Sequence, residues 1–337
     1  MKVDGVLLSS GLQGVPAVAR ELEELGYDGA FSAETAHEPF FPLLLAAEHT
    51  ERLELITGIA VAFARNPMTL ANVGYDLQAY SQGRFVLGLG SQIKAHIEKR
   101  FSMPWSHPAA RMRELILAMR AIWASWNDGD KLDFRGEFYR HTLMTPFFNP
   151  GPNPYGVPRV FLAAVGARMT EVAGEVADGI LLHGFTTERY VREVTLPALE
   201  RGWARGGKQR GDFEVSGPMF VVTGTNEDEF EGARRATKQQ IAFYGSTPAY
   251  RGVLELHGWG DLQGELNRLS KQGEWAAMGE LVTDDILETF AVVAEPEDVP
   301  RQLLERYGDV VDRVSFYAPY KSDPDRWSKV LDGFRAA

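Results

Sequence analysis

Eight short apolar runs that alternate with helical stretches predict an α/β fold, a (β/α)8 TIM barrel forming one domain over residues 1–337. The runs have the length expected of buried parallel strands, and several end in small or polar residues. Two stretches are longer than one connecting helix requires, so we expect insertions after the fourth strand and between the seventh and eighth strands. The predicted strands cover residues 3–8, 29–33, 53–62, 85–87, 160–164, 179–182, 213–222 and 311–317.

Helices are expected between these strands, where apolar residues recur every three or four positions. The first helix carries Val18, Leu22 and Leu25 on one face after Pro16, and Gly26 ends it. Asn66-Pro67 is typical of a helix start, with the asparagine as cap. The other predicted helices cover residues 42–50, 66–80, 112–126, 167–177, 187–205 and 323–334, with several more over 225–295. A hairpin over 131–139 and a proline-rich segment precede the fifth strand.

The composition of the chain excludes several classes of function. The net charge of −11 argues against a nucleic-acid partner, because phosphate binding requires a basic surface. No apolar run is long enough to cross a membrane, so no membrane partner is expected. Cysteine is absent, which excludes disulfides and thiolate metal ligands and is compatible with the cytoplasm. The seven histidines are scattered, so no metal site is expected.

Four residues fall at or near the carboxyl ends of different predicted strands: Glu34, Ser91, Gly166 and His183. A (β/α)8 barrel places its chemistry at this end of its strands. The pattern therefore predicts the face that carries the site, and leaves the reaction open. Gly88 and Gly90 allow two interpretations, since such glycines either let the backbone approach a bound group or form a tight turn.

Five segments carry a resemblance to a known family. They are Leu53–Ile59, Arg65–Pro67, Gly83–Gly90, Gly136–Tyr139 and Leu162–Gly166. In this order and spacing they resemble the bacterial luciferase-like monooxygenase superfamily, and most of all its branch of coenzyme F420-dependent oxidoreductases. The resemblance extends over about residues 1–220.

The resemblance implies a tricyclic cofactor in the barrel mouth, with its phosphate near the end of the fifth strand. Gly166, Ala167 and Arg168 begin a predicted helix, where free N–H groups and the helix dipole attract an anion. A solvated Arg168 is the alternative. By resemblance, the cofactor-binding residues are Glu34, Gly58, Ile59, Ala60, Ser91, Gln92, Ala164, Val165, Gly166, Ala167 and Arg168. A cis peptide between Gly58 and Ile59 is also implied, together with a homodimer and a small-molecule substrate.

Glu34 and His37 are the predicted catalytic residues. Relatives often end the second strand with Asp-His or Glu-His, whereas this chain has Glu34-Thr35 and a histidine only at His37. An imidazole can donate a proton near neutral pH, so we expect His37 to serve the substrate and Glu34 the cofactor. A helix-capping Glu34 and a solvated His37 are the alternatives. After the third strand the run from Val61 to Pro67 is more apolar than in relatives, which indicates a different substrate.

Three functions remain open on the sequence. The first is an F420-dependent oxidoreductase that passes hydride between the deazaflavin and an unidentified organic molecule. The second is an FMN-dependent monooxygenase on the same barrel, and the third is a cofactor-binding protein without turnover. Aromatic residues in the insertions, among them Phe147, Phe148 and Tyr244, indicate an apolar or planar substrate.

Overall fold

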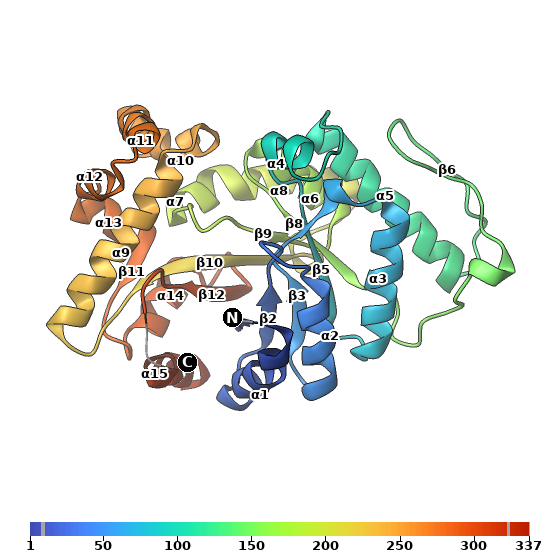
Figure 1. The fold of residues 1–337 in the computed structure, drawn as a ribbon, viewed down its shortest axis with the longest axis horizontal. Helices are drawn as coiled ribbons and strands as arrows, with labels where there is room; N and C mark the ends of the chain where they lie inside the picture. Colours follow the sequence, from blue (N-terminus) through green and yellow to red (C-terminus); the bar gives the residue numbers. More distant parts are fainter. Residues whose placement is uncertain (8–10, 322–323, 337) are drawn as a thin grey trace. The chain divides into compact units, whose positions relative to one another are not determined.

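Parallel strands and the helices that connect them make up most of the computed structural model, which describes residues 1–7, 11–321 and 324–336 (Figure 1). The chain has the predicted α/β fold of the eight-stranded, TIM-barrel type. Its contacts group the residues into two compact units. The first unit holds residues 4–181 and 198–214, and the second unit holds residues 1–3, 182–197 and 215–337. A single domain therefore stays a prediction.

The sheet of the first unit consists of parallel strands in the order β1-β2-β3-β5-β8-β9. These strands are β1 (Lys2–Val6, in this unit from Asp4 onward), β2 (Gly29–Ser32), β3 (Glu54–Thr57), β5 (Phe85–Gly90), β8 (Arg159–Ala163) and β9 (Gly179–Leu181). All six residues of β5 are buried, as expected of a strand covered on both faces. Ile56, Val86, Phe161 and Leu181 form a core cluster between neighbouring strands.

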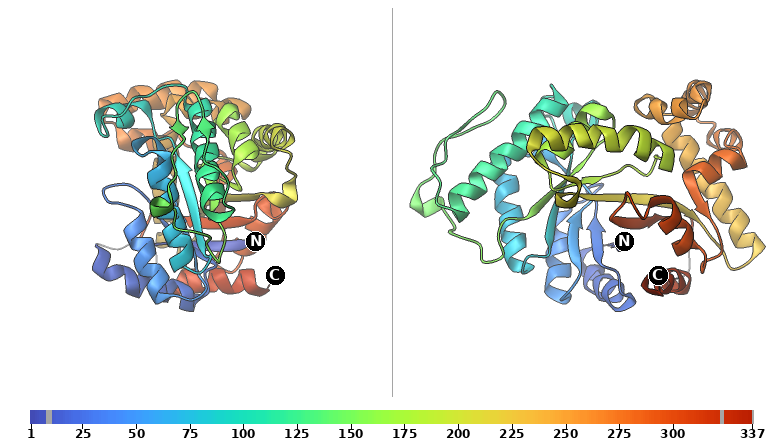
Figure 2. Two further views of the ribbon diagram at one scale, coloured as in Figure 1. Left: turned by 90° about the vertical axis from the view of Figure 1, so that its right-hand side faces the viewer. Right: turned by 180° about the vertical axis from the view of Figure 1, so that it is seen from behind.

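The helices of the first unit follow its strands. They are α1 (Val15–Leu25), α2 (Phe40–His49), α3 (Pro67–Tyr80), α4 (Lys94–Lys99), α5 (Pro108–Asn127), α6 (Ala167–Val176) and α8 (Leu196–Gly206, in this unit from Ala198 onward). The predicted ends are confirmed at two of them: the Asn66 side chain accepts the Thr69 N–H at 3.0 Å, and Gly26 ends α1 in the left-handed region. Helices α3 and α5 lie side by side (Figure 2).

The third predicted strand is wrong in one respect, because residues 53–62 do not form a continuous strand. The structure divides them into β3 and the short β4 (Ala60–Val61). The peptide between Gly58 and Ile59 is cis, as the resemblance implied. Backbone geometry of this kind leaves no trace in an apolar pattern, which is why the strand prediction missed the break.

The insertion after β5 contains α5 and an antiparallel hairpin, β6 (Phe134–Arg135) with β7 (Arg140–His141). One carboxylate organises the hairpin turn: Glu114 of α5 accepts the backbone N–H groups of Glu137, Phe138 and Tyr139 at 2.9, 2.7 and 2.6 Å. The proline-rich segment that follows exposes Phe147 and Phe148. Both aromatic side chains therefore lie on the surface, and the expectation of an apolar or planar substrate stays a prediction.

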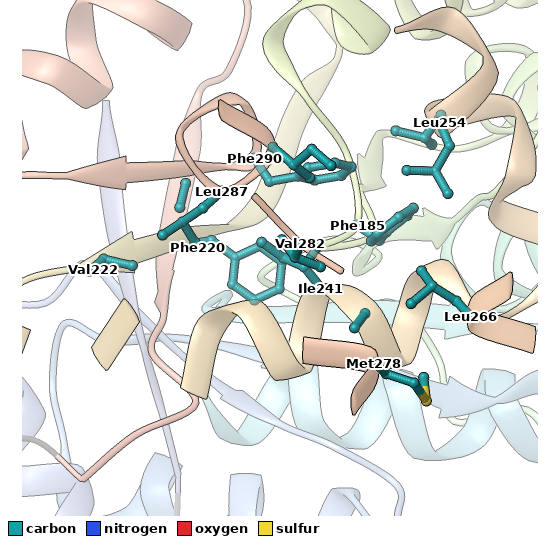
Figure 3. Packing of buried hydrophobic residues seen from close by; sticks show 14 of the residues in the cluster. Phe185, Phe220, Val222, Ile241, Leu254, Leu266, Met278, Val282, Leu287 and Phe290 are labelled. Carbon is teal, nitrogen blue, oxygen red and sulfur yellow. The ribbon is translucent and has the colours of Figure 1, made fainter. Parts of the chain in front are cut away.

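In the second unit β10 (Glu214–Val222, in this unit from Val215 onward) pairs in parallel with both β11 (Ala291–Val293) and β12 (Arg313–Tyr317). The sequence analysis missed β11, because three apolar residues between two helices are too short to predict a strand. The helices are α7 (Glu188–Tyr190), α9 (Glu227–Gly245), α10 (Arg251–Leu256), α11 (Gly260–Gln272), α12 (Trp275–Glu280), α13 (Asp284–Phe290), α14 (Val299–Tyr307) and α15 (Pro324–Ala336). Their apolar faces meet in a core that includes Phe185, Phe220, Ile241 and Leu287 (Figure 3).

None of the helices in the described part of the chain is long and apolar enough to span a lipid bilayer.

Candidate active site at the strand ends

Glu34 lies two residues beyond the end of β2 and is held by its side chain. One carboxylate oxygen, Oε2, accepts the Val61 N–H at 2.7 Å and the Arg65 Nη1–H at 2.6 Å. The Glu34 backbone N–H donates to Ile59 O at 3.1 Å. Glu34 is buried, and no hydrogen bond from the described residues reaches its second oxygen, Oε1. The side chain therefore has a fixed position and one acceptor oxygen left for a ligand.

Arg65 is the residue that sequence reasoning missed. Its second nitrogen, Nη2, donates to both carboxylate oxygens of Glu38 at 2.7 Å, so the guanidinium bridges two carboxylates. The same guanidinium lies over the Phe40 ring, 5.5 Å from the ring centroid. These contacts leave Arg65 a single orientation and hold Glu34 in place. The sequence signal was Arg65 inside the family-like segment Arg65–Pro67, without any indication of its carboxylate partners.

The backbone beside Glu34 comes from the break between β3 and β4. Gly58 N–H donates to Ser32 O at 2.8 Å, and Ala60 is buried while Ile59 is half-buried. This hydrogen bond and the one from the Glu34 N–H to Ile59 O connect the end of β2 to the break between β3 and β4. The structure thus brings Gly58, Ile59 and Ala60 next to Glu34, as their assignment to one site requires.

Gly88 has a role in packing rather than in binding. A Cβ atom on Gly88 would lie 1.8 Å from the Thr57 carbonyl oxygen. The Thr57 hydroxyl donates to Gly88 O and accepts the Gly88 N–H, both at 2.8 Å. A Cβ atom on Gly90 would likewise meet the Ile59 side chain, at 2.9 Å. Both glycines lie within β5 and not in a turn, and the close approach of the neighbouring residues Thr57 and Ile59, which neither interpretation proposed, explains them.

Ser91 and Gln92 follow directly after β5. Both are half-buried, and the Ser91 hydroxyl donates to Gln92 O at 3.1 Å. Gln92 has a φ of 57°, a left-handed conformation that non-glycine residues adopt infrequently. No hydrogen bond given for the described residues links this pair to Glu34, so their shared role as cofactor contacts stays a prediction.

The predicted anion site lies at the start of α6. Gly166 caps this helix with a φ of 81° and supplies no side-chain cap, and Val165 to Arg168 are exposed. Ala164 is buried just before them. Within residues 1–7, 11–321 and 324–336, Arg168 makes no ion pair. Free N–H groups and an unpaired guanidinium at one helix end suit a phosphate.

His37 lies between β2 and α2, exposed to solvent, and no hydrogen bond to its ring is found among the described residues. Its catalytic role stays a prediction. His183, the fourth strand-end residue, follows β9 in the second unit and is engaged by the backbone and by tyrosines there.

The fold and these side chains define an α/β-barrel protein with polar groups at the carboxyl ends of its strands, where barrels of this type place their binding sites. The model of the luciferase-like monooxygenase family matches residues 2–313, and the chain belongs to that family. It is accordingly an oxidoreductase of the flavin- or deazaflavin-dependent type.

Several known proteins are similar to this chain. An uncharacterized protein of Mycobacterium tuberculosis is 60% identical over 93% of this chain and 92% of its own length. A 5,10-methylenetetrahydromethanopterin reductase of Archaeoglobus fulgidus is 27% identical over 83% of this chain and 81% of its own length. The solved structure of the coenzyme F420 dependent tetrahydromethanopterin reductase from Methanopyrus kandleri has a TM-score of 0.78 at 20% identity, covering 99% of this chain and 96% of that chain.

Proposed function

We propose that this chain is a coenzyme F420-dependent oxidoreductase that transfers hydride between the deazaflavin and a small organic substrate. The observation that supports a cofactor with a phosphate is the start of α6, where uncapped N–H groups and Arg168, which makes no ion pair with the described residues, offer a phosphate two kinds of contact. The names of the archaeal relative and of the Methanopyrus structure support the choice of a reductase, and the latter names F420.

The residues present fit a ring with a phosphate. Arg168 and the first N–H groups of α6 would hold the phosphate, while Gly58, Ile59, Ala60, Ala164 and Val165 would border the ring. Glu34 Oε1 would accept a hydrogen bond from a donor on the ring edge, and Ser91 with Gln92 would add a second polar contact. Bound F420 supplies a carbon centre that accepts and donates hydride.

Hydride transfer to or from an organic substrate also requires a residue of the protein that donates or accepts a proton. Two N–H donors point at Glu34 Oε2, so that oxygen accepts hydrogen bonds and the side chain is kept still. We assign the proton transfer to His37, because it is exposed three residues after Glu34 and an imidazole is the commonest general acid or base in enzymes.

A fluorescence titration of F420 and of FMN into the purified apoprotein tests the proposal. We expect F420 to bind at least about tenfold more tightly, a difference of about 1.4 kcal/mol. Equal or reversed affinities would replace the proposal with the FMN-dependent monooxygenase. A homodimer is proposed on the family resemblance alone, and sedimentation equilibrium measures it directly.

A further inference from the structure

Three tyrosines and a histidine lie together in the second unit: Tyr244 is near the end of α9, Tyr250 directly precedes α10, Tyr317 ends β12, and His183 is close to the unit's first residue, Leu182. We call His183, Tyr244, Tyr250 and Tyr317 the hydroxyl cluster. The imidazole of His183 stacks on the Tyr250 ring with centroids 4.5 Å apart and planes at 26°. It meets the Tyr244 ring edge-on at 4.7 Å. All four side chains are half-buried, so solvent reaches part of each of them.

The hydrogen bonds of His183 fix the position of its proton. Nδ1 accepts the backbone N–H of Phe185 at 3.0 Å, so this nitrogen carries no hydrogen. Burial lowers the pKa of His183 to about 4, so the ring is neutral at pH 7. The single proton is then on Nε2, and Nε2–H donates to the Tyr250 hydroxyl oxygen at 3.2 Å.

Two hydroxyl protons of the tyrosines therefore have no acceptor among the residues that the structure describes. Tyr250 accepts from His183, and among the residues that the structure describes nothing accepts its own proton. Tyr244 and Tyr317 share one hydrogen bond of 2.6 Å, which uses only one of their two protons. Burial and then this hydrogen bond raise the pKa of Tyr317, which is consistent with Tyr317 as the donor. The free protons are then those of Tyr250 and Tyr244.

The apolar core of the second unit holds these donors in place. Tyr317 stacks on Phe220 with centroids 4.6 Å apart and planes at 13°, and Phe185 packs against Phe290 at 4.6 Å. Phe185 also contacts the Tyr250 ring, at 5.8 Å between centroids. Figure 3 shows Phe185, Phe220 and Phe290 within this core. A Cβ atom on Gly184 would lie 2.8 Å from Tyr317 Cδ1, so a glycine is needed beside that ring.

We propose that the hydroxyl cluster is a binding site for a planar, apolar molecule with a carbonyl oxygen, which the Tyr244 and Tyr250 hydroxyls bind by hydrogen bonds. The ligand supplies an acceptor, because the unused groups are donors. It carries a neutral polar group, because no charged side chain in the described ranges bonds to or stacks on the four rings. Aromatic walls with a few fixed polar groups are typical of small-molecule sites.

Titration of the full-length protein with carbonyl-labelled acetophenone tests this site, and it needs no cofactor. Infrared difference spectra should show saturable binding, with the carbonyl stretch shifted to lower frequency than in an apolar solvent. Tyr250→Phe and Tyr244→Phe should each weaken binding by about threefold to tenfold and reverse part of the shift. Tyr190→Phe is the matched control, because Tyr190 packs against the same core and its hydroxyl is not part of the cluster. This variant should leave binding and spectrum unchanged.

The absence of saturable binding, or equal effects of Tyr190→Phe and Tyr250→Phe, would overturn the proposal. A second measurement on the free protein checks the hydrogen-bond assignment without any ligand. Nitrogen NMR of His183 at pH 7 should show a neutral ring protonated at Nε2. Protonation at Nδ1 would make Tyr250 the donor to the imidazole, and the free donor on which the site depends would be lost.

Discussion

At the scale of single residues, the candidate site depends on a carboxylate held at one of its two oxygens. Arg65 bridges two glutamates that differ in burial: the Glu34 side chain is 6% exposed and the Glu38 side chain is 38% exposed. A buried carboxylate that loses a partner is destabilised far more than an exposed one. The two glutamates therefore form a matched pair for experiment.

Glu34→Gln should weaken F420 binding by about 1–3 kcal/mol, because it removes the charged acceptor that we assign to the cofactor. Glu38→Gln is the control and should leave the affinity within about threefold, since Glu38 accepts from Arg65 Nη2 and not from the Nη1 that donates to Glu34. Titration of both variants gives the two affinities. Equal losses in the two variants would contradict a specific role for Glu34.

His37→Ala should lower turnover by about 10²–10⁴ with cofactor affinity nearly kept, the usual loss of a general acid. The exposed His96 in α4 supplies the control, and His96→Ala should turn over like the unmodified protein. Steady-state rates of the two variants with any substrate that the enzyme accepts measure this difference in turnover. Normal turnover by His37→Ala would remove this histidine from the mechanism and leave Glu34, or a bound water, as the proton source.

At the scale of elements, α6 and β5 have different tasks. The start of α6 is exposed and uncapped, which suits ligand binding, whereas β5 is buried along its whole length and requires glycine for packing. Substitutions in the two elements should accordingly separate affinity from stability.

Arg168→Ala should weaken F420 binding by about 1–3 kcal/mol and leave the thermal midpoint nearly unchanged, because the side chain is exposed. Arg135→Ala on the hairpin removes another exposed arginine and serves as the control. Calorimetric titration measures the affinities. An unchanged affinity for Arg168→Ala would mean that the helix N-terminus suffices or that the phosphate binds elsewhere.

Gly88→Ala should destabilise the fold by more than about 3 kcal/mol, because its Cβ atom would lie 1.8 Å from Thr57 O inside the sheet. Gly232→Ala, inside α9 with open space around it, should be neutral or stabilising by up to about 1 kcal/mol. Urea unfolding of both variants gives the two free energies. If Gly88→Ala were as stable as Gly232→Ala, the packing role of Gly88 would be wrong.

At the scale of the whole molecule, hydrophobic periodicity was sufficient to predict the barrel class and most helices. The stripe from Met112 to Trp126 is buried as expected of a core helix, within the longer α5. Periodicity is silent on backbone breaks and on short strands, so the division of the third strand and the existence of β11 were missed. Residues 8–10, on which the predicted end of the first strand falls, lie outside the described residues.

The candidate site was predictable only in part. Glu34, Ile59 and Ala60 were named from their positions near strand ends and from family resemblance, and the structure brings them together. The bridge from Glu34 through Arg65 to Glu38 joins residues from separate segments, and no local pattern reports such a contact. The same holds for the hydroxyl cluster, whose members are as far apart in the chain as His183 and Tyr317.

The most direct test of the central claim is a competition titration, in which F420 is added to protein that has been equilibrated with FMN. An F420-dependent enzyme that binds F420 about tenfold more tightly should lose half of its FMN when the F420 concentration is about one tenth of the FMN concentration. Retention of FMN at equal concentrations of the two cofactors would contradict the account and identify the protein as an FMN-dependent member of its family.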